Sequence, residues 1–232
     1  MNPRFMPIID VSSAPLSRVS LVPVYGLLFL AIMFTVLGCA VGATVALPLI
    51  TSGWIIALFI LELAIVWTAP SWTHSTPLNY VLFAAFPFLS GLTVAPIIIN
   101  VLVGYANGTT ILLNALIATG LMTLSSAVLA TISNTDLGGV FGRFLFQGLI
   151  GLIGFSLLQI FFPSLRGQGI EQVFSAIGII IFSLFLAVDI QRVQRRQGVD
   201  SPFLMAIALY LDIFNLFLFI LRFMTAGGER RG

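Results

Sequence analysis

The stretch FLMAIALYLDIFNLFLFILR, residues 203–222, is apolar throughout except for one acid, Asp212, near its middle and Asn215 and Arg222 further along. A run of about 20 apolar residues is long enough to cross a bilayer as a helix. The preceding apolar segment, residues 170–191, carries Asp189 close to its end. A carboxylate at membrane depth costs about 2.5–3.5 kcal/mol on insertion scales, so such groups face the bundle interior and have partners. We therefore predict that Asp189 and Asp212 share one site.

The composition of the whole chain agrees with a membrane protein. Of its 232 residues, 59% are hydrophobic and 8% are charged, whereas soluble domains carry about 25% charged residues. Apolar runs of about 20 residues recur, which favours helices over the alternating strands, about ten residues long, of a membrane barrel. The net charge of +2 argues against a nucleic-acid partner, and a single cysteine, Cys39, excludes an internal disulfide.

Hydropathy predicts an all-α, polytopic membrane helix bundle with seven transmembrane helices. The expected spans are about 21–47, 54–69, 80–103, 111–132, 144–162, 170–191 and 203–222. Residues 1–20 form a polar amino-terminal tail, 21–223 the transmembrane domain and 224–232 a short carboxy-terminal tail. In the first span, Gly38 and Gly42 have the GxxxG spacing that allows two helices to approach closely.

The arginines favour an amino terminus on the inner side of the membrane, because basic residues accumulate in inner loops. With seven spans, the inner regions carry Arg4, Arg18, Arg143, Arg192, Arg195 and Arg196, and the outer regions carry Arg166, Arg222, Arg230 and Arg231. A re-entrant last segment would strengthen this bias, but its twenty apolar residues make a full span. The short tails favour a prokaryotic cell membrane; a thylakoid or organelle membrane is the alternative.

The two aspartates lie at compatible depths. Asp212 is roughly 14 Å along its helix, and Asp189 lies roughly 9 Å inside Arg195, at 1.5 Å per residue. Two carboxylates in contact in a low dielectric cannot both ionise easily, so we expect them to share a proton. The loss of that proton would push the helices apart. Such a pair is a pH-sensitive latch, and its oxygens suit a hard cation, so Asp189 and Asp212 are the candidate Ca²⁺ ligands.

Simpler roles remain open for these residues. Asp189 precedes Arg192 by three residues, so one alternative is that an ion pair within one helix is its whole role. Asp212 has Asn215 on the same face, and the alternative for it is a purely structural, hydrogen-bonded role. Glu62, in the second span, is either part of a permeation path or a buried neutral carboxyl. We place Glu62, Asn215 and Arg192 in a secondary ion pathway.

An enzymatic reading is the third possibility. Two intramembrane aspartates can act as the acid and the base of an intramembrane aspartyl protease. The local sequences AVDIQ and LYLDIF lack the YD and GxGD motifs of such proteases, however, and no span contains a histidine for a serine protease. No cofactor motif is present. We therefore expect no enzymatic activity and no cofactor, with calcium only as a permeant ion.

The run FSLFLAVDIQRV, followed by ALYLDIFNLFLFILR, resembles the carboxy-terminal signature of the transmembrane Bax inhibitor motif family. The resemblance implies seven helices with the last one central, and a pH-dependent calcium leak latched by Asp189 and Asp212. Glu62 stands where the family tends to have an acid. Family members often have a basic residue near the end of the second helix, and here that region offers only His74.

The resemblance also implies possible partners besides the lipid bilayer and calcium. Eukaryotic members are associated with the suppression of cell death, and some bacterial members resemble modulators of a membrane-anchored ATP-dependent protease. The main alternative to a leak is therefore a non-conducting regulator that binds a membrane protease or another membrane partner.

Overall fold

The computed structural model describes residues 22–51, 53–195 and 201–230, and within them the chain is almost entirely helical. Its elements are α1 (Val22–Thr51), α2 (Trp54–Trp67), α3 (Ala69–Trp72), α4 (Leu78–Gly104), α5 (Gly108–Ile132), α6 (Leu137–Phe161), the 3₁₀ turn η2 (Pro163–Arg166), α7 (Gln168–Arg195) and α8 (Pro202–Ala226). Six helices are long and apolar enough to cross a membrane, and α2 is a shorter apolar helix. The predicted all-α membrane bundle is confirmed. The predicted tail, residues 1–20, lies outside the described residues.

Three predicted boundaries were wrong. The first helix does not end at residue 47 but continues through Pro48 to Thr51, with the loss of the one backbone hydrogen bond that proline cannot donate to the preceding turn. The second span breaks at Thr68, where α2 gives way to α3. The fifth span begins at Leu137 rather than at residue 144, because the Asp136 side chain caps it by accepting a hydrogen bond from the Gly138 amide, 3.2 Å away.

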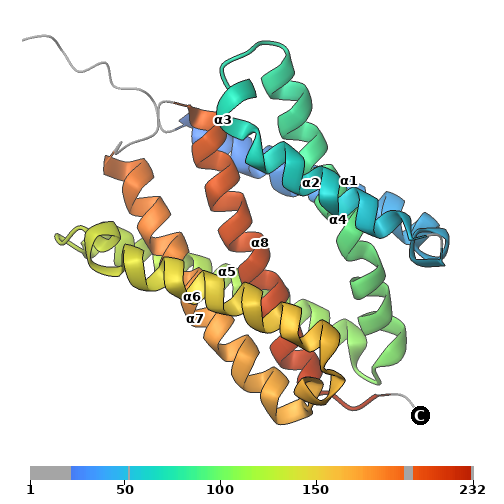
Figure 1. Ribbon diagram of the computed structural model, residues 1–232. Coiled ribbons are helices and arrows are strands. Elements are labelled where there is room, and N and C mark those ends of the chain that lie inside the picture. Colours follow the sequence, from blue (N-terminus) through green and yellow to red (C-terminus); the bar gives the residue numbers. More distant parts are fainter. Residues whose placement is uncertain (1–21, 52, 196–200, 231–232) are drawn as a thin grey trace, which may run out of the picture.

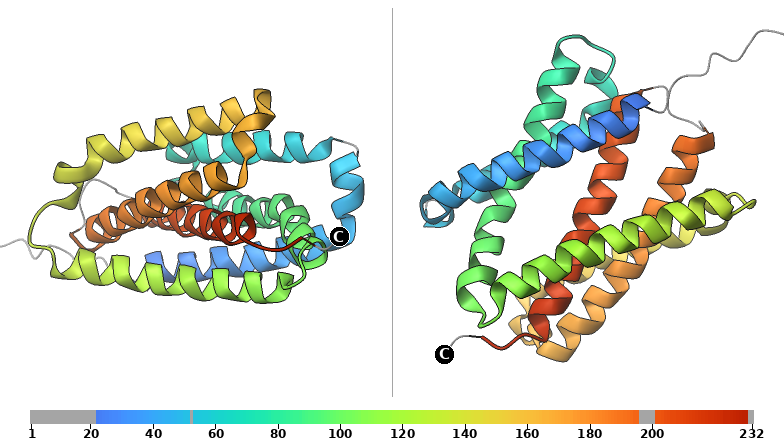
Figure 2. Two further views of the ribbon diagram at one scale, coloured as in Figure 1. Left: turned by 90° about the horizontal axis from the view of Figure 1, so that it is seen from below. Right: turned by 180° about the vertical axis from the view of Figure 1, so that it is seen from behind.

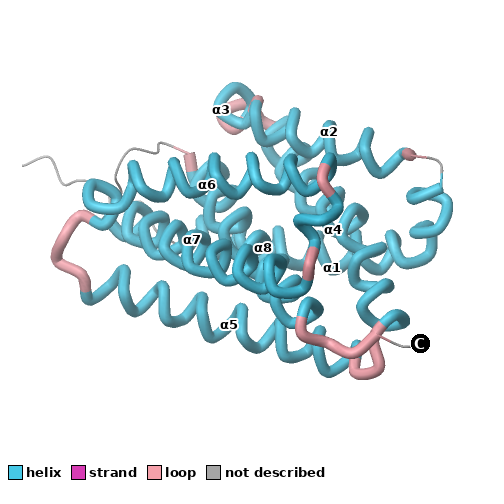
Figure 3. The backbone as a smooth tube through the Cα atoms, turned by 60° about the horizontal axis from the view of Figure 1, so that its bottom comes forward, coloured by secondary structure: helices cyan, strands magenta, loops and turns pink. Residues whose placement is uncertain are grey.

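Helix α8 is central, as predicted. Figures 1 and 2 show it with α7 on one side and with α1, α2 and α4 on the other. It packs against α1, α4, α5 and α7. The tube in Figure 3 shows α5 and α6 on the two sides of α7. The side chains of Ala206, Leu209, Leu216 and Leu221 are almost fully buried. A helix whose apolar residues are buried on several sides belongs in the interior of a bundle.

Helices α1 and α4 meet backbone to backbone. A Cβ atom added at Gly38 would collide with the carbonyl oxygen of Phe88, and one added at Gly91 would collide with the carbonyl oxygen of Thr35. At Gly42, an added Cβ would lie 2.6 Å from Ala95 Cβ. The GxxxG pair therefore does act as a packing face, and Gly91 of α4 completes it.

Candidate functional site

The carboxyl pair lies between α7 and α8, toward the end of the bundle where α7 finishes and α8 begins. Asp212 is buried, with 7% of its surface exposed, and Asp189 is partly buried. The two carboxyl groups are neighbours across α7 and α8, close enough for the charge of each to affect the other. Asp212 Oδ2 is buried and has no hydrogen-bond partner among the described residues.

Arg192 supplies a cation to this pair. Its Nη1 lies 2.9 Å from Asp189 Oδ1, and its side chain is half exposed (49%) while that of Asp189 is 15% exposed. The ion pair that the sequence suggested within one helix is thus present, beside the neighbouring Asp212 carboxyl. Arg192 therefore lies between the carboxyl pair and the solvent at this end of the bundle.

Gln191 connects the loop between α5 and α6 to α7, the helix that carries Asp189, through hydrogen bonds. Its Oε1 accepts a hydrogen bond from the Leu137 amide (2.8 Å), and its Nε2 donates to the carbonyl of Thr135 (3.0 Å). Only 2% of Gln191 is exposed, and Arg195 adds a bond to the carbonyl of Ser133 (2.8 Å). The sequence analysis overlooked Gln191, although an amide in an apolar helix two residues after Asp189 was a usable signal.

Glu62 lies on the other side of α8 from the aspartates, in a cluster of hydroxyl groups. Ser90 Oγ donates to its Oε2 (2.9 Å) and Thr93 Oγ1 donates to its Oε1 (2.8 Å). Ser90 also interacts with the Tyr210 hydroxyl, which lies 2.7 Å from Thr35 Oγ1. These contacts connect α2, α4, α8 and α1. The structure therefore separates Glu62 from the Asp189–Asp212 pair.

In the part of the chain that the structure describes, neither Asn215 nor His74 is hydrogen-bonded to the aspartate pair. Asn215 donates to the carbonyl of Leu211 in its own helix (2.8 Å) and forms no hydrogen bond with Asp212 among the described residues. His74 is exposed in the loop that precedes α4 and makes no contact with the pair. The cation near Asp189 therefore comes from α7 itself, through Arg192, and not from the end of the second helix.

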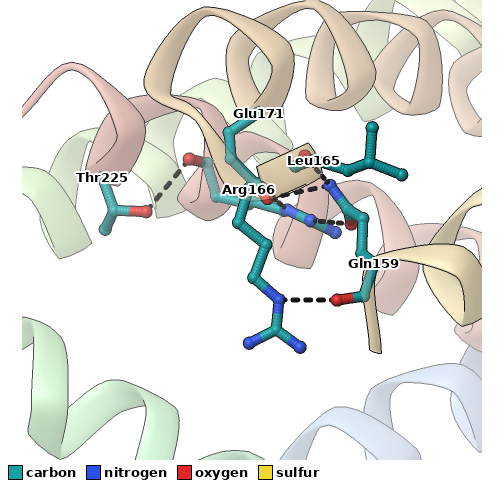
Figure 4. A network of polar contacts seen from close by, with 6 residues as sticks. Gln159, Leu165, Arg166, Glu171 and Thr225 are labelled. Carbon is teal, nitrogen blue, oxygen red and sulfur yellow. Dashed lines mark hydrogen bonds and ion pairs between the residues drawn. The ribbon is translucent and has the colours of Figure 1, made fainter. Parts of the chain in front are cut away.

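A polar network at the opposite end of α8 was not predicted (Figure 4). Arg222 donates through Nε to Glu171 Oε2 of α7 and through Nη2 to Gln159 Oε1 of α6, the latter at 2.6 Å. Gln159 Nε2 in turn donates to Glu171 Oε1 (2.9 Å). The Arg222 guanidinium also lies 4.7 Å from the centre of the Phe174 ring. This network joins α6, α7 and α8.

The sequence has relatives across bacteria, plants and animals. The family described as inhibitor of apoptosis-promoting Bax1 matches residues 18–229. An uncharacterised protein of Campylobacter jejuni is 34% identical over 76% of this chain and 73% of its own length. Protein LIFEGUARD 3 of Arabidopsis thaliana is 31% identical over 88% of this chain and 82% of its own length, and protein lifeguard 4 of Mus musculus is 31% identical over 68% and 62%.

These matches agree with the fold and with the residues that first indicated it. The family match extends over both helices of the carboxyl pair and over the helices around them. The bundle has the predicted central last helix, and its apolar helices make it an integral, multi-pass membrane protein. The chain belongs to the Bax inhibitor family.

Proposed function

We propose that this protein is a passive calcium leak, gated by the protonation of the Asp189–Asp212 pair. The observation that carries the proposal is the proximity of these two carboxyl groups across α7 and α8, with Asp212 buried and its Oδ2 without a hydrogen-bond partner among the described residues. While they share a proton, the pair holds the two helices together. When the pH rises and the proton leaves, two negative charges face each other in a low dielectric and repel.

The donor set suits a permeant ion better than a resident one. Among the described residues, no three His, Cys, Asp or Glu side chains come together. A tight calcium site takes about six to eight oxygen ligands, and two carboxylates fall well short of that number. An ion that meets only these two carboxylates can bind briefly and leave, as conduction requires.

Replacement of Asp212 by asparagine should abolish the pH dependence of calcium flux. Asparagine cannot ionise, so the site carries at most the single negative charge of Asp189 and the repulsion between two carboxylates cannot arise at any pH. Flux into liposomes that contain the native protein should rise between pH 5 and pH 8, and the Asp212→Asn profile should be flat. Asp136→Asn is the matched control, because Asp136 caps α6 outside the pair.

Two results would overturn the leak. An unchanged pH profile in Asp212→Asn would exclude the latch. The absence of flux at any pH, together with copurification of a stoichiometric membrane protein, would favour the non-conducting regulator.

Glu62→Gln should distinguish between the two alternative roles of Glu62, part of an ion pathway or a structural group. Glutamine keeps a carbonyl that Ser90 or Thr93 can donate to, but it removes the negative charge. With Glu62 in a secondary ion pathway, we expect lower flux at every pH and a midpoint of thermal unfolding close to that of the native protein. Equal flux in Glu62→Gln and the native protein would restrict Glu62 to a structural role.

A further inference from the structure

A pocket opens between α5, α7 and α8, at the end of the bundle that holds the Arg222 network. Its volume is about 430 Å³, which falls within the range of about 300–1,000 Å³ typical of small-molecule sites. Asn107, which precedes α5, lines it together with Thr110 and Asn114 of α5, Gln172 of α7, and Phe223 and Met224 of α8. The pocket therefore combines an amide and hydroxyl wall with an apolar wall.

The polar side chains of this wall have no partners within the described protein. Asn107, Thr110 and Asn114 follow the i, i+3, i+7 spacing of one helix face, and all three are exposed. Neither these three side chains nor that of Gln172 forms a hydrogen bond to another described residue. Exposed hydroxyls deeper in α5 behave differently: Ser125 donates to the carbonyl of Leu121 in its own helix, 2.9 Å away.

The depth of Asn114 makes its free amide informative. Asn114 lies six residues after Gly108, the first residue of α5, and so roughly 9 Å along the helix. Its neighbours Leu113, Leu116 and Ile117 are exposed apolar residues, as expected of a surface that faces lipid. An amide at this depth without a hydrogen-bond partner is costly, because hydrocarbon offers none.

The pocket has no net charge. None of its lining side chains is ionisable, and the nearest ion pair, Arg222 with Glu171, is internally neutralised. Beside it, residues after α8 fold back onto the turn between α4 and α5: the Ala106 amide donates to the carbonyl of Glu229 (3.2 Å), and Arg230 lies over the Tyr105 ring at 5.8 Å. These charged residues lie outside the pocket lining.

We propose that this pocket binds a membrane glycerolipid whose headgroup carries no net charge. The amides and hydroxyl of α5 and Gln172 bond the ester carbonyls and headgroup, while Phe223 and Met224 contact the start of an acyl chain. The lipid supplies the partners that Asn107, Thr110 and Asn114 lack. This site is independent of the aspartate pair and of calcium flux.

Native mass spectrometry of the full chain in detergent, titrated with palmitoyl-oleoyl phosphatidylethanolamine, tests the proposal. We expect one retained lipid per native chain. Asn114→Leu should weaken its binding by about fivefold to tenfold, the effect of one or two lost hydrogen bonds. Thr109→Val is the matched control, because Thr109 is an exposed α5 residue that does not line the pocket, and its binding should equal that of the native protein.

A second variant tests the site by filling it. Gly227 lines the pocket with a right-handed backbone (φ −96°) that accepts a side chain, and an added Cβ would lie 3.1 Å from Gln172 Nε2. Gly227→Leu should therefore also reduce lipid retention. Equal retention in both variants and in Thr109→Val would overturn the proposal. The proposal would also be overturned if the protein retained only phosphatidylglycerol and lost it in high salt, because lipid binding would then belong to the arginines. A dimer that is lost in Asn114→Leu would overturn it as well, because this face would then bind a second copy of the chain.

Discussion

Gly91→Ala is expected to destabilise the protein strongly, although it adds only one methyl group. The new Cβ would overlap the carbonyl oxygen of Thr35 and lie 2.7 Å from the Cys39 amide nitrogen. Both are backbone atoms of α1, so no side chain can rotate away, and the two helices must separate. Overpacking typically costs about 1–3 kcal/mol and occasionally more. At about 2–4 °C per kcal/mol for a chain of this size, we expect the unfolding midpoint to fall by roughly 5–10 °C.

Gly120→Ala provides the control for this experiment. Gly120 lies inside α5 and has no atom within 4 Å of an added Cβ. Alanine is a better helix former than glycine by about 1 kcal/mol, so Gly120→Ala should leave the midpoint unchanged or raise it. Thermal unfolding in detergent, followed by tryptophan fluorescence, measures both. Equal midpoints for Gly91→Ala and Gly120→Ala would show that α1 and α4 do not touch at their backbones.

The second large effect is expected at the Arg222 network, from Glu171→Gln. This change removes the charge that faces the Arg222 guanidinium and leaves it with Gln159 Oε1 and the Phe174 ring. Breaking a fully buried ion pair costs about 3–5 kcal/mol. Because the Arg222 side chain is 33% exposed, solvent screens part of this loss, and we expect about 2–3 kcal/mol.

A double-variant comparison distinguishes this coupling from a general loss of packing. Glu171→Gln combined with Arg222→Gln removes both charges, so it should be less destabilising than the two single changes added together. Arg166→Gln is the control, because Arg166 is exposed and donates one bond to the Gln159 carbonyl (2.9 Å). It should cost less than about 1 kcal/mol. Additive losses in the double variant would contradict a direct interaction between Glu171 and Arg222.

Most of the fold followed from hydropathy, because each span needs about 20 apolar residues whatever it packs against. The boundaries were harder to predict, since they depend on single contacts. Helix α6 begins at Leu137, seven residues before the predicted start at residue 144, because Asp136 caps it. The close approach of α1 and α4 was only half visible: GxxxG marks Gly38 and Gly42, but nothing in one sequence assigns Gly91 as the partner.

The acids of the candidate site could be predicted from the sequence, but their hydrogen-bond partners could not. An acid in an apolar helix is conspicuous, so Asp189, Asp212 and Glu62 could be found, and the antiparallel order of α7 and α8 placed the first two together. The polar partners of an acid come from helices distant in sequence, and no spacing rule identifies them. The hydroxyls of Ser90 and Thr93 around Glu62, and the pairing of Arg222 with Glu171 rather than with a residue near Asp212, required the packed bundle.

The Arg222 network gives α8 a fixed end. Arg222 is ten residues beyond Asp212, which is about 15 Å along the helix, and it binds both α6 and α7. In the proposed gating, repulsion between the two aspartates would therefore tilt α8 about the contacts of the Arg222 guanidinium. A tilt of roughly 10° about that point displaces Asp212 by only about 2.6 Å over this 15 Å arm. Repulsion at one end of the bundle can thus open that end while the other end keeps its ion pair and its packing.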